Sequence, residues 1–199
     1  MQIKTIRCHE NSEDITTVTL DTIDLALPAD DEVQVAVKAC AVNFPDILKI
    51  QGKYQRKPPL PFAPGGEAAG EIIAIGKDVT NFAVGDKVIW GADYGSFTEA
   101  LNINSRSVKA MPQAMDYAAA ASFQTTYLTA WVGLTCRGHL QPGENLLIHG
   151  ATGGVGMAAV DLGKYLGANV IATGGRDDKL EVVKSRGADH VINYTMPNG

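Results

Sequence analysis

A glycine-rich run at residues 150–156 (GATGGVG) constrains the fold of this chain more than any other feature. The apolar residues 146–149 before it read as a buried strand, and residues 155–166 after it read as a helix. The alternation continues with an expected strand at 169–173, a helix at 178–186 and a strand at 190–194. Such an order is typical of a parallel, doubly wound α/β sheet.

The run matches the G-x-G-x-x-G pattern of dinucleotide-binding turns, with Ala151 in place of the first glycine. Gly153 fills the second position, where a side chain would keep a pyrophosphate away from the backbone. Gly156 fills the third, where the helix packs closely on the strand. The phosphates then lie at the helix N-terminus, where free N–H groups and the helix dipole favour anions. We therefore expect dinucleotide binding, against the alternative of an ordinary tight turn.

The end of the second expected strand indicates which dinucleotide is bound. NAD sites usually place a carboxylate there, about 20 residues on, to bind the ribose 2′-hydroxyl. This chain reads TGGR at residues 173–176, followed by Lys179. Arg176 and Lys179 are suited to pair with a 2′-phosphate, which predicts NADP(H). Asp177 and Asp178 lie beside them, so NAD remains the alternative, with both cations then simply solvated.

The first hundred residues are predicted to form β structure. Residues 32–42 alternate, with apolar side chains on one face and Gln34 and Lys38 on the other. The other strand candidates, separated by Gly and Pro, are residues 2–7, 16–20, 71–75, 87–90 and 96–101. Helices are expected at 45–51 and 117–137, the latter ending at Gly138. Residues 1–122 are thus the first expected domain and residues 123–199 the second.

The chain ends at Gly199, after only the first βαβαβ half of a nucleotide-binding sheet. A half-sheet has one open edge and an uncovered apolar face. We favour a truncated sheet over one that another chain covers.

Composition narrows the class of protein. With 45% hydrophobic and 20% charged residues the chain is an ordinary globular protein. Its formal net charge of −5 argues against nucleic acid or an anionic membrane as partner. No apolar run approaches the roughly 20 residues that span a bilayer, and the N-terminus lacks the apolar core of a secretory signal. Three widely separated cysteines, expected to be buried or half-buried free thiols, fit a cytoplasmic protein.

Three stretches resemble the medium-chain dehydrogenases/reductases, and among them the zeta-crystallin-like quinone oxidoreductases. They are residues 42–46 (VNFPD), residues 52–70 with the distinctive PFAPGGEAAG, and the glycine run together with Tyr194. The chain departs from the family at Thr152, where a small residue is usual, and at Asp161, where Gln is usual. The resemblance implies a GroES-like β-barrel domain followed by a Rossmann-type sheet, here truncated.

The resemblance also implies roles for individual residues. Asn43 would lie near the nicotinamide and the substrate, and Tyr54 would orient the acceptor carbonyl or donate a hydrogen bond to it. The residues implied in cofactor binding are Asn43, Thr129, Gly153, Gly154, Val155, Gly156, Gly175, Arg176, Lys179 and Tyr194. Structural roles remain the alternatives for three residues: Asn43 as a helix cap, Tyr54 as a loop anchor and Thr129 as a helix-surface residue.

The residue types at positions 43 and 66 predict a zinc-independent enzyme. A catalytic zinc needs about three protein ligands and an open position. The alcohol dehydrogenase relatives place a Cys near Asn43 and a His near Gly66, where this chain has an amide and a glycine. Their four-cysteine structural lobe is missing, and the four histidines here are scattered along the chain. We therefore expect no metal.

These observations predict NADPH-dependent reduction of a quinone or an α,β-unsaturated carbonyl, by hydride delivery from the nicotinamide. An enoyl-thioester reductase is the alternative within the same superfamily. From another class, the alternative is a truncated, non-catalytic form that binds a partner. A homodimer is expected for a full-length protein, while the electron acceptor and the activity of the 199-residue form stay open.

Overall fold

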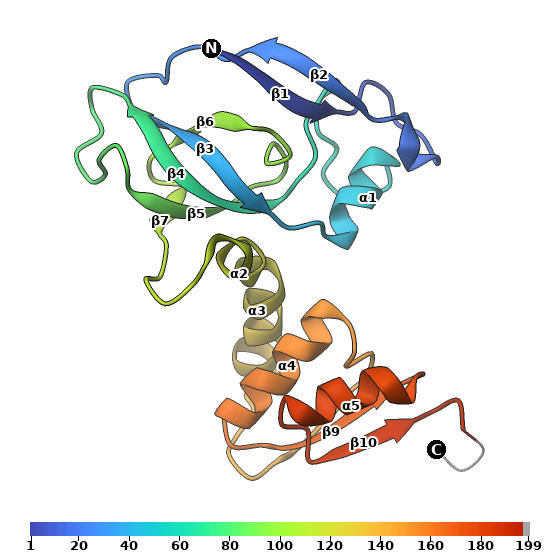
Figure 1. Ribbon diagram of the computed structural model, residues 1–199. Coiled ribbons are helices and arrows are strands. Elements are labelled where there is room, and N and C mark those ends of the chain that lie inside the picture. Colours follow the sequence, from blue (N-terminus) through green and yellow to red (C-terminus); the bar gives the residue numbers. More distant parts are fainter. Residues whose placement is uncertain (197–199) are drawn as a thin grey trace. The chain divides into compact units, whose positions relative to one another are not determined.

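The computed structural model describes residues 1–196, and the chain divides into two compact units (Figure 1). The first unit is Met1–Gln124, and the second begins at Thr125. All strand pairs of the first unit are antiparallel, whereas those of the second are parallel.

A five-stranded antiparallel sheet forms the body of the first unit, in the order β6-β3-β4-β5-β7. Its strands are β3 (Glu32–Cys40), β4 (Glu67–Ile75), β5 (Lys87–Gly91), β6 (Ala100–Asn104) and β7 (Val108–Ala110). Its core contains buried β-branched and aromatic side chains: Val33, Val35, Ile72, Val88 and Trp90. Trp90 keeps its polar atom satisfied, because Nε1 donates to Ser96 Oγ over 3.1 Å.

A two-stranded sheet made of β1 (Gln2–Arg7) and β2 (Thr19–Asp24) lies in the same unit, with a short 3₁₀ turn, η1 (Ile15–Thr17), between the strands. Isolated bridges, Thr5 to Thr98 and Cys8 to Phe62, connect β1 and the residue after it to other segments of the unit. The outer strands β6 and β7 of the larger sheet do not pair with each other. The β structure expected for the first domain is therefore present as two sheets joined by isolated bridges, and residues 1–124 contain no closed barrel.

Two details of the first unit differ from the sequence-based prediction. The strand expected at 96–101 begins only at Ala100, because the backbone N–H groups of Ser96 and Phe97 donate to Gly65 and Pro64 rather than to β3. Gln34, expected on a solvent-facing side, is buried. Its Nε2 donates to Ala26 O and to Asn102 Oδ1, so the preceding loop covers this position.

Besides η1, four helical elements precede the parallel sheet in the chain. Helix α1 (Phe44–Ile50) follows β3, with Pro45 in its first turn as predicted. The segment expected to be helical at 117–137 is divided into α2 (Tyr117–Ala121), α3 (Phe123–Trp131) and a π-helical turn, η2 (Val132–Arg137), which ends at Gly138. Of the three free cysteines, Cys8 is buried, as expected. Cys40 and Cys136 are exposed, so the expectation of buried or half-buried thiols was wrong for these two.

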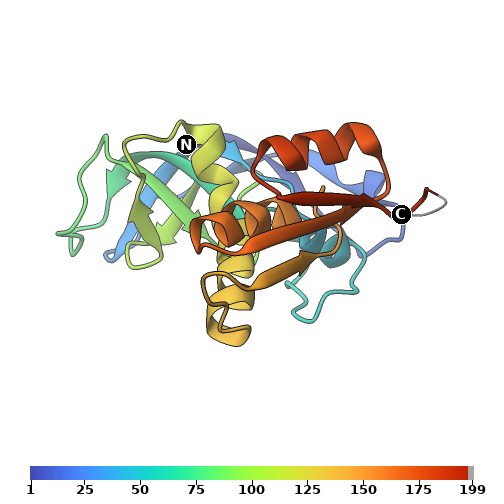
Figure 2. The same ribbon diagram turned by 90° about the horizontal axis from the view of Figure 1, so that it is seen from below.

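The second unit has the predicted parallel sheet, in the order β10-β9-β8 (Figure 2). Its elements are β8 (Asn145–Ile148), α4 (Gly154–Tyr165), β9 (Asn169–Gly174), α5 (Asp177–Ser185) and β10 (His190–Asn193). Both crossovers proceed in the same direction along the sheet, and parallel crossovers are right-handed, so α4 and α5 cover the same face. Ala158, Val160, Val170, Ala172 and Val183 form the core between the helices and the sheet.

Candidate functional site

The glycine-rich turn joins β8 to α4 and is fixed to the neighbouring strand. Gly150 adopts a φ of +63°, a conformation that glycine allows without strain. Ala151 N donates to Thr173 O on β9 over 3.1 Å, and Gly153 N donates to Gly150 O over 3.0 Å. Both of these bonds join backbone groups, and the exposed Gly153 and Gly154 present no side chain at the start of α4.

Gly156 is the position at which the helix approaches the turn most closely. A Cβ there would lie 2.4 Å from Gly150 O and 2.7 Å from the Cα of Ala151. Both neighbours are backbone atoms, which cannot rotate away as the end of a side chain can. The close packing predicted for the third glycine is thus present, and it has a structural cause independent of any ligand.

Gly153 differs from Gly156, because a Cβ at Gly153 would meet only Gly150 O, at an ordinary 3.5 Å. Gly153 is exposed and forms the N-cap of α4 without a capping side chain. The first turn of α4 contains no acidic residue. The N–H groups of Gly154, Val155 and Gly156 have no acceptor within the helix, as in every first turn. This open, positively polarised helix end fits the pyrophosphate of a dinucleotide.

The residues expected around a 2′-phosphate converge at the carboxyl end of β9. Arg176 forms the N-cap of α5, and its guanidinium binds Asp178 through two hydrogen bonds, Nε to Oδ1 at 2.9 Å and a terminal nitrogen to Oδ2 at 2.7 Å. This guanidinium is the main cause that lowers the pKa of Asp178 below its ordinary value. Lys179 is exposed and forms no ion pair with any residue between 1 and 196.

Tyr194 lies beside Gly175, at the place where the sequence predicted ring area for the adenosine. A Cβ on Gly175 would be 3.1 Å from the Tyr194 hydroxyl, so the glycine gives the ring its room. Tyr194 N donates to Gly174 O, and Asn193 Nδ2 donates to Asp177 Oδ1 over 2.6 Å. The ring itself is 64% exposed and available to a ligand. The structure thus brings Gly175, Arg176 and Tyr194 together, while their contact with a cofactor stays a prediction.

Thr129 lies on an exposed part of α3. Its Oγ1 donates to Thr125 O, one helical turn earlier, over 2.6 Å. The hydroxyl proton is therefore used within the helix, and only the oxygen lone pairs remain for a ligand. A cofactor contact by Thr129 stays a prediction.

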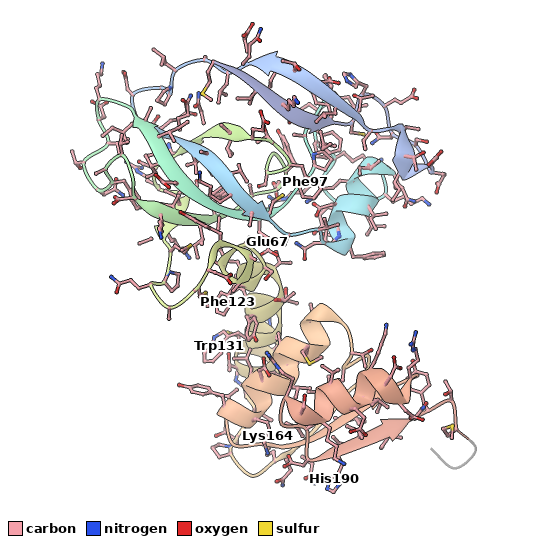
Figure 3. All side chains as sticks on the ribbon, in the orientation of Figure 1. Glu67, Phe97, Phe123, Trp131, Lys164 and His190 are labelled. Atoms are coloured by element: carbon pink, nitrogen blue, oxygen red, sulfur yellow. The ribbon has the colours of Figure 1, made fainter. Side chains whose placement is uncertain are left out.

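In the first unit, Asn43 precedes α1 and is tied to two carboxylates. Its backbone N donates to Asp46 Oδ2, and its side-chain Nδ2 donates to Glu67 Oε1, each over 2.9 Å. Glu67 comes from the start of β4 (Figure 3) and is only 1% exposed. A carboxylate oxygen accepts this bond, so the Asn43 amide turns its nitrogen toward Glu67, and Asn43 is also the N-cap of α1, the structural role that the sequence left open for it.

A buried cluster of charged residues surrounds this asparagine, and the sequence analysis did not single it out. Asp46 is 2% and Lys49 5% exposed, and Lys49 Nζ lies 4.0 Å from Asp46 Oδ1. Asp46 Oδ1 has no hydrogen-bond partner among the described residues. Lys49 Nζ also lies 5.1 Å from the centre of the Tyr54 ring, a cation–π distance. Lys49 thus lies beside Tyr54 and beside Asp46, the residue whose carboxylate binds the backbone of Asn43.

Sequence signals for this cluster did exist. Asp46 and Lys49 are three residues apart on an expected helix, so they share one face. Glu67 begins a stretch that is otherwise small and apolar. Neither signal says that the face is buried, because that depends on segments distant in sequence, such as the one at Gly66, which lies beside both side chains.

The residues at these positions do not fit a catalytic zinc. Asn43 Nδ2 already binds Glu67, and Gly66 has no side chain to offer. The cationic Nζ of Lys49 lies 3.9 Å from the point where a Cβ on Gly66 would be. No group of three metal-ligating side chains occurs within residues 1–196. A cation is thus already present beside the space that a metal would need.

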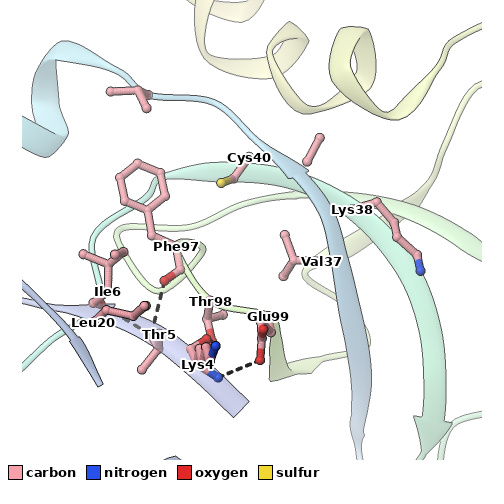
Figure 4. Close-up of a pocket in the computed structure, with 12 residues that line it drawn as sticks. Lys4, Thr5, Ile6, Leu20, Val37, Lys38, Cys40, Phe97, Thr98 and Glu99 are labelled. Carbon is pink, nitrogen blue, oxygen red and sulfur yellow. Dashed lines mark hydrogen bonds between the residues drawn. The ribbon is translucent and has the colours of Figure 1, made fainter. Parts of the chain in front are cut away.

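A separate open pocket of about 550 Å³ lies in the first unit between β1, β3 and the segment around Phe97 (Figure 4). Ile6, Val37 and Phe97 form apolar walls. None of the predicted site residues lines this pocket, although Cys40 does, and partial desolvation by the surrounding atoms raises the pKa of its thiol. Across the described part of the chain, no helix is long and apolar enough to cross a membrane.

Comparison with known families gives two matches in chain order. Residues 29–128 match the alcohol dehydrogenase GroES-like domain, and residues 154–198 match the family described as zinc-binding dehydrogenase. The quinone oxidoreductase-like protein 2 homolog of Nematostella vectensis is 40% identical over 169 residues, which are 84% of this chain and 46% of that protein. The chain therefore spans about half the length of this curated relative.

Solved structures agree with these matches. The Escherichia coli quinone oxidoreductase, crystallised with NADPH, superposes with a TM-score of 0.86 at 31% identity, over 96% of this chain and 58% of that chain. The CurK enoyl reductase superposes with a TM-score of 0.88 at 31% identity, over 98% of this chain and 61% of that chain.

Proposed function

The chain belongs to the medium-chain dehydrogenase/reductase family, in its quinone oxidoreductase branch, and on that premise we propose that it is part of an NADPH-dependent reductase of a quinone or an α,β-unsaturated carbonyl. The observation that carries the proposal is the glycine turn, whose bare backbone and open α4 N-terminus suit a pyrophosphate. The E. coli relative, whose structure holds NADPH, supports it. A bound nicotinamide cofactor would supply the hydride.

We propose that the second unit binds the cofactor through two sets of groups. Gly153, Gly154, Val155 and Gly156 provide the backbone surface for the pyrophosphate, which is common to NADH and NADPH. Gly175, Arg176, Lys179 and Tyr194 then surround the 2′-phosphate, which only NADPH carries. The two exposed cations and the exposed ring support this assignment. Thr129 is proposed as a further cofactor contact, through its hydroxyl oxygen.

We propose that Asn43 and Tyr54 carry the chemistry of the first unit. With its nitrogen held by Glu67, Asn43 accepts a hydrogen bond from cofactor or substrate through Oδ1. The donor for the acceptor carbonyl is then the Tyr54 hydroxyl, because the Asn43 amide nitrogen already donates to Glu67 Oε1. Lys49, 5.1 Å from the Tyr54 ring centre, helps to hold that ring in place.

The first experiment titrates the 199-residue chain with NADPH and with NADH and follows nicotinamide fluorescence. We expect saturable binding with preference for NADPH. Chain that binds NADPH is then assayed with benzoquinones and with small enones, by the loss of absorbance of the reduced nicotinamide. Binding of neither cofactor to correctly folded chain would contradict the proposal.

An enoyl-thioester reductase is the second candidate, favoured by the similarity to the CurK enoyl reductase. Turnover of a crotonyl thioester at a higher kcat/KM than any quinone would decide for it. A non-catalytic, partner-binding form is the third candidate, and cofactor binding without turnover of any acceptor would decide for it. We further propose residues 1–122 and 123–199 as the two domains, a cytoplasmic location, and a homodimer for the longer protein, which light scattering would test.

A further inference from the structure

The strongest observation that the proposed function leaves unexplained is the pair formed by Arg176 and Asp178. Both oxygens of the Asp178 carboxylate bind the guanidinium, at 2.9 and 2.7 Å, in the parallel two-bond geometry that arginine also uses for phosphate. The same carboxylate accepts from backbone N–H groups at the start of α5, which with Arg176 helps to keep its pKa low. Asp178 is therefore an ionised carboxylate held by the donors that a bound phosphate would use.

Neighbouring charges show why this pairing concerns selectivity. Asp177, next in the chain, is bound elsewhere, because its Oδ1 accepts from Asn193 Nδ2 on β10. Lys179 has no ion-pair partner within the described residues. Of the two cations at this end of β9, one is thus committed to an internal carboxylate and the other is free. A 2′-phosphate therefore has to share or displace Asp178 to reach Arg176.

We propose that Asp178 is a specificity-determining residue that competes with the 2′-phosphate of NADPH for Arg176 and so limits the preference of the site for NADPH over NADH. The proposal rests on the proposed function, since it needs a dinucleotide at this end of β9. NADH, which has no 2′-phosphate, leaves the pair intact. Removing the carboxylate should therefore improve NADPH binding and leave NADH binding unchanged.

The expected effect is set by the strength of an exposed ion pair. Both side chains are more than half exposed, and such a pair changes an equilibrium constant by no more than about fivefold. We expect Asp178→Asn to lower the Kd for NADPH about three- to fivefold at low ionic strength, and less as salt is added.

The test compares Asp178→Asn with Asp177→Asn in the full chain. Asp177→Asn removes the same charge from the adjacent position, and the introduced amide oxygen can still accept from Asn193 Nδ2. Kd values are measured for NADPH and NADH by fluorescence, and for adenosine 2′,5′-bisphosphate and adenosine 5′-monophosphate by calorimetry. The Asp178→Asn change is repeated in an Arg176→Ala background, where a competitor for Arg176 has nothing left to release.

The expected result is tighter binding of NADPH and the bisphosphate in Asp178→Asn alone, with no gain in the Arg176→Ala background. An equal gain in Asp177→Asn, or a gain that survives Arg176→Ala, would overturn the proposal, because Asp178 would then act through bulk charge. A loss of NADH binding in Asp178→Asn would also overturn it, since the carboxylate would then bind the ribose hydroxyl. If unsubstituted chain binds no dinucleotide, the proposed function fails too; if it binds NADPH and Asp178→Asn changes nothing, only this inference fails.

Discussion

Replacing Gly156 by alanine tests how the glycine turn is built. The added Cβ would lie 2.4 Å from Gly150 O, whereas ordinary contacts begin near 3.4 Å, so α4 and the turn must separate by about 1 Å. The turn cannot yield freely, because Ala151 N is bound to Thr173 O on β9. Overpacking of this kind costs about 1–3 kcal/mol, and the better helix propensity of alanine returns up to about 1 kcal/mol. We expect a net loss of about 1–2 kcal/mol.

Urea unfolding followed by far-UV circular dichroism measures this loss. For a unit of this size the slope is about 1 kcal/mol per M, so the midpoint of Gly156→Ala should fall by about 1–2 M. Gly153→Ala is the matched control, because its Cβ would be 3.5 Å from the nearest atom and its φ of −88° suits alanine. Its free energy of unfolding should stay within about 0.5 kcal/mol of that of the unsubstituted chain.

A bulkier substitution at the same position, Gly153→Val, is tested by its effect on the binding of NADPH and NADH. Its side chain projects from the exposed N-cap into the space assigned to the pyrophosphate, so NADPH and NADH should both lose binding while the fold is retained. Gly156→Ala that unfolds at the same urea concentration as the unsubstituted chain would refute the steric argument. Unchanged cofactor affinity in Gly153→Val would refute the placement of the pyrophosphate.

Three further changes test other parts of the molecule. Arg176→Ala should weaken NADPH about tenfold and NADH less than twofold, because only NADPH carries the 2′-phosphate; equal losses in the fluorescence titration would show that Arg176 does not read it. Tyr54→Phe should lower kcat about a hundredfold without changing cofactor affinity, if its hydroxyl donates to the acceptor; an unchanged kcat would make Tyr54 a loop anchor. Bonds from Lys164 and from the backbone of Val170 lower the pKa of Asp189 in the folded chain. The ionised Asp189 therefore stabilises the folded chain fully above the ordinary pKa of about 4. This stabilisation disappears as the pH falls through the lowered pKa. Asp189→Asn should therefore lower the urea midpoint at pH 7 and not at pH 2, and equal losses at both would point to packing instead.

The second unit was the part that local sequence rules could predict. Its strands and helices carry their own apolar pattern, and the glycines mark the turn, so the parallel α/β arrangement follows from short-range signals. The role of Gly156 was also predictable, because only a residue without a Cβ permits the approach to Gly150 O that the structure shows. Among residues 1–196, β8 pairs only with β9, and Leu147 on β8 is 52% exposed.

The first unit was less predictable, because its charged cluster depends on contacts between distant segments. Nothing near Asp46 or Lys49 in the chain shows that the backbone at Gly66 will lie beside them, or that Glu67 will lie 2.9 Å from the Asn43 amide. Gln34 shows the same limit. Strand alternation puts it opposite the valines, but burial of that side comes from Ala26 and Asn102, neither of which periodicity can locate.

The glycine turn and the end of β9 would recognise different parts of the proposed cofactor. The pyrophosphate surface is made of backbone, which presents the same groups whatever side chains surround it, so it cannot distinguish NADH from NADPH. Discrimination has to come from side chains at the end of β9, where Arg176 and Asp178 already bind each other. Changes at Gly153 should consequently move both affinities together, and changes at Arg176 or Asp178 should move their ratio. If the proposed site is right, affinity and selectivity depend on different groups: the backbone of the turn would set affinity for both cofactors, and Asp178 would set their ratio.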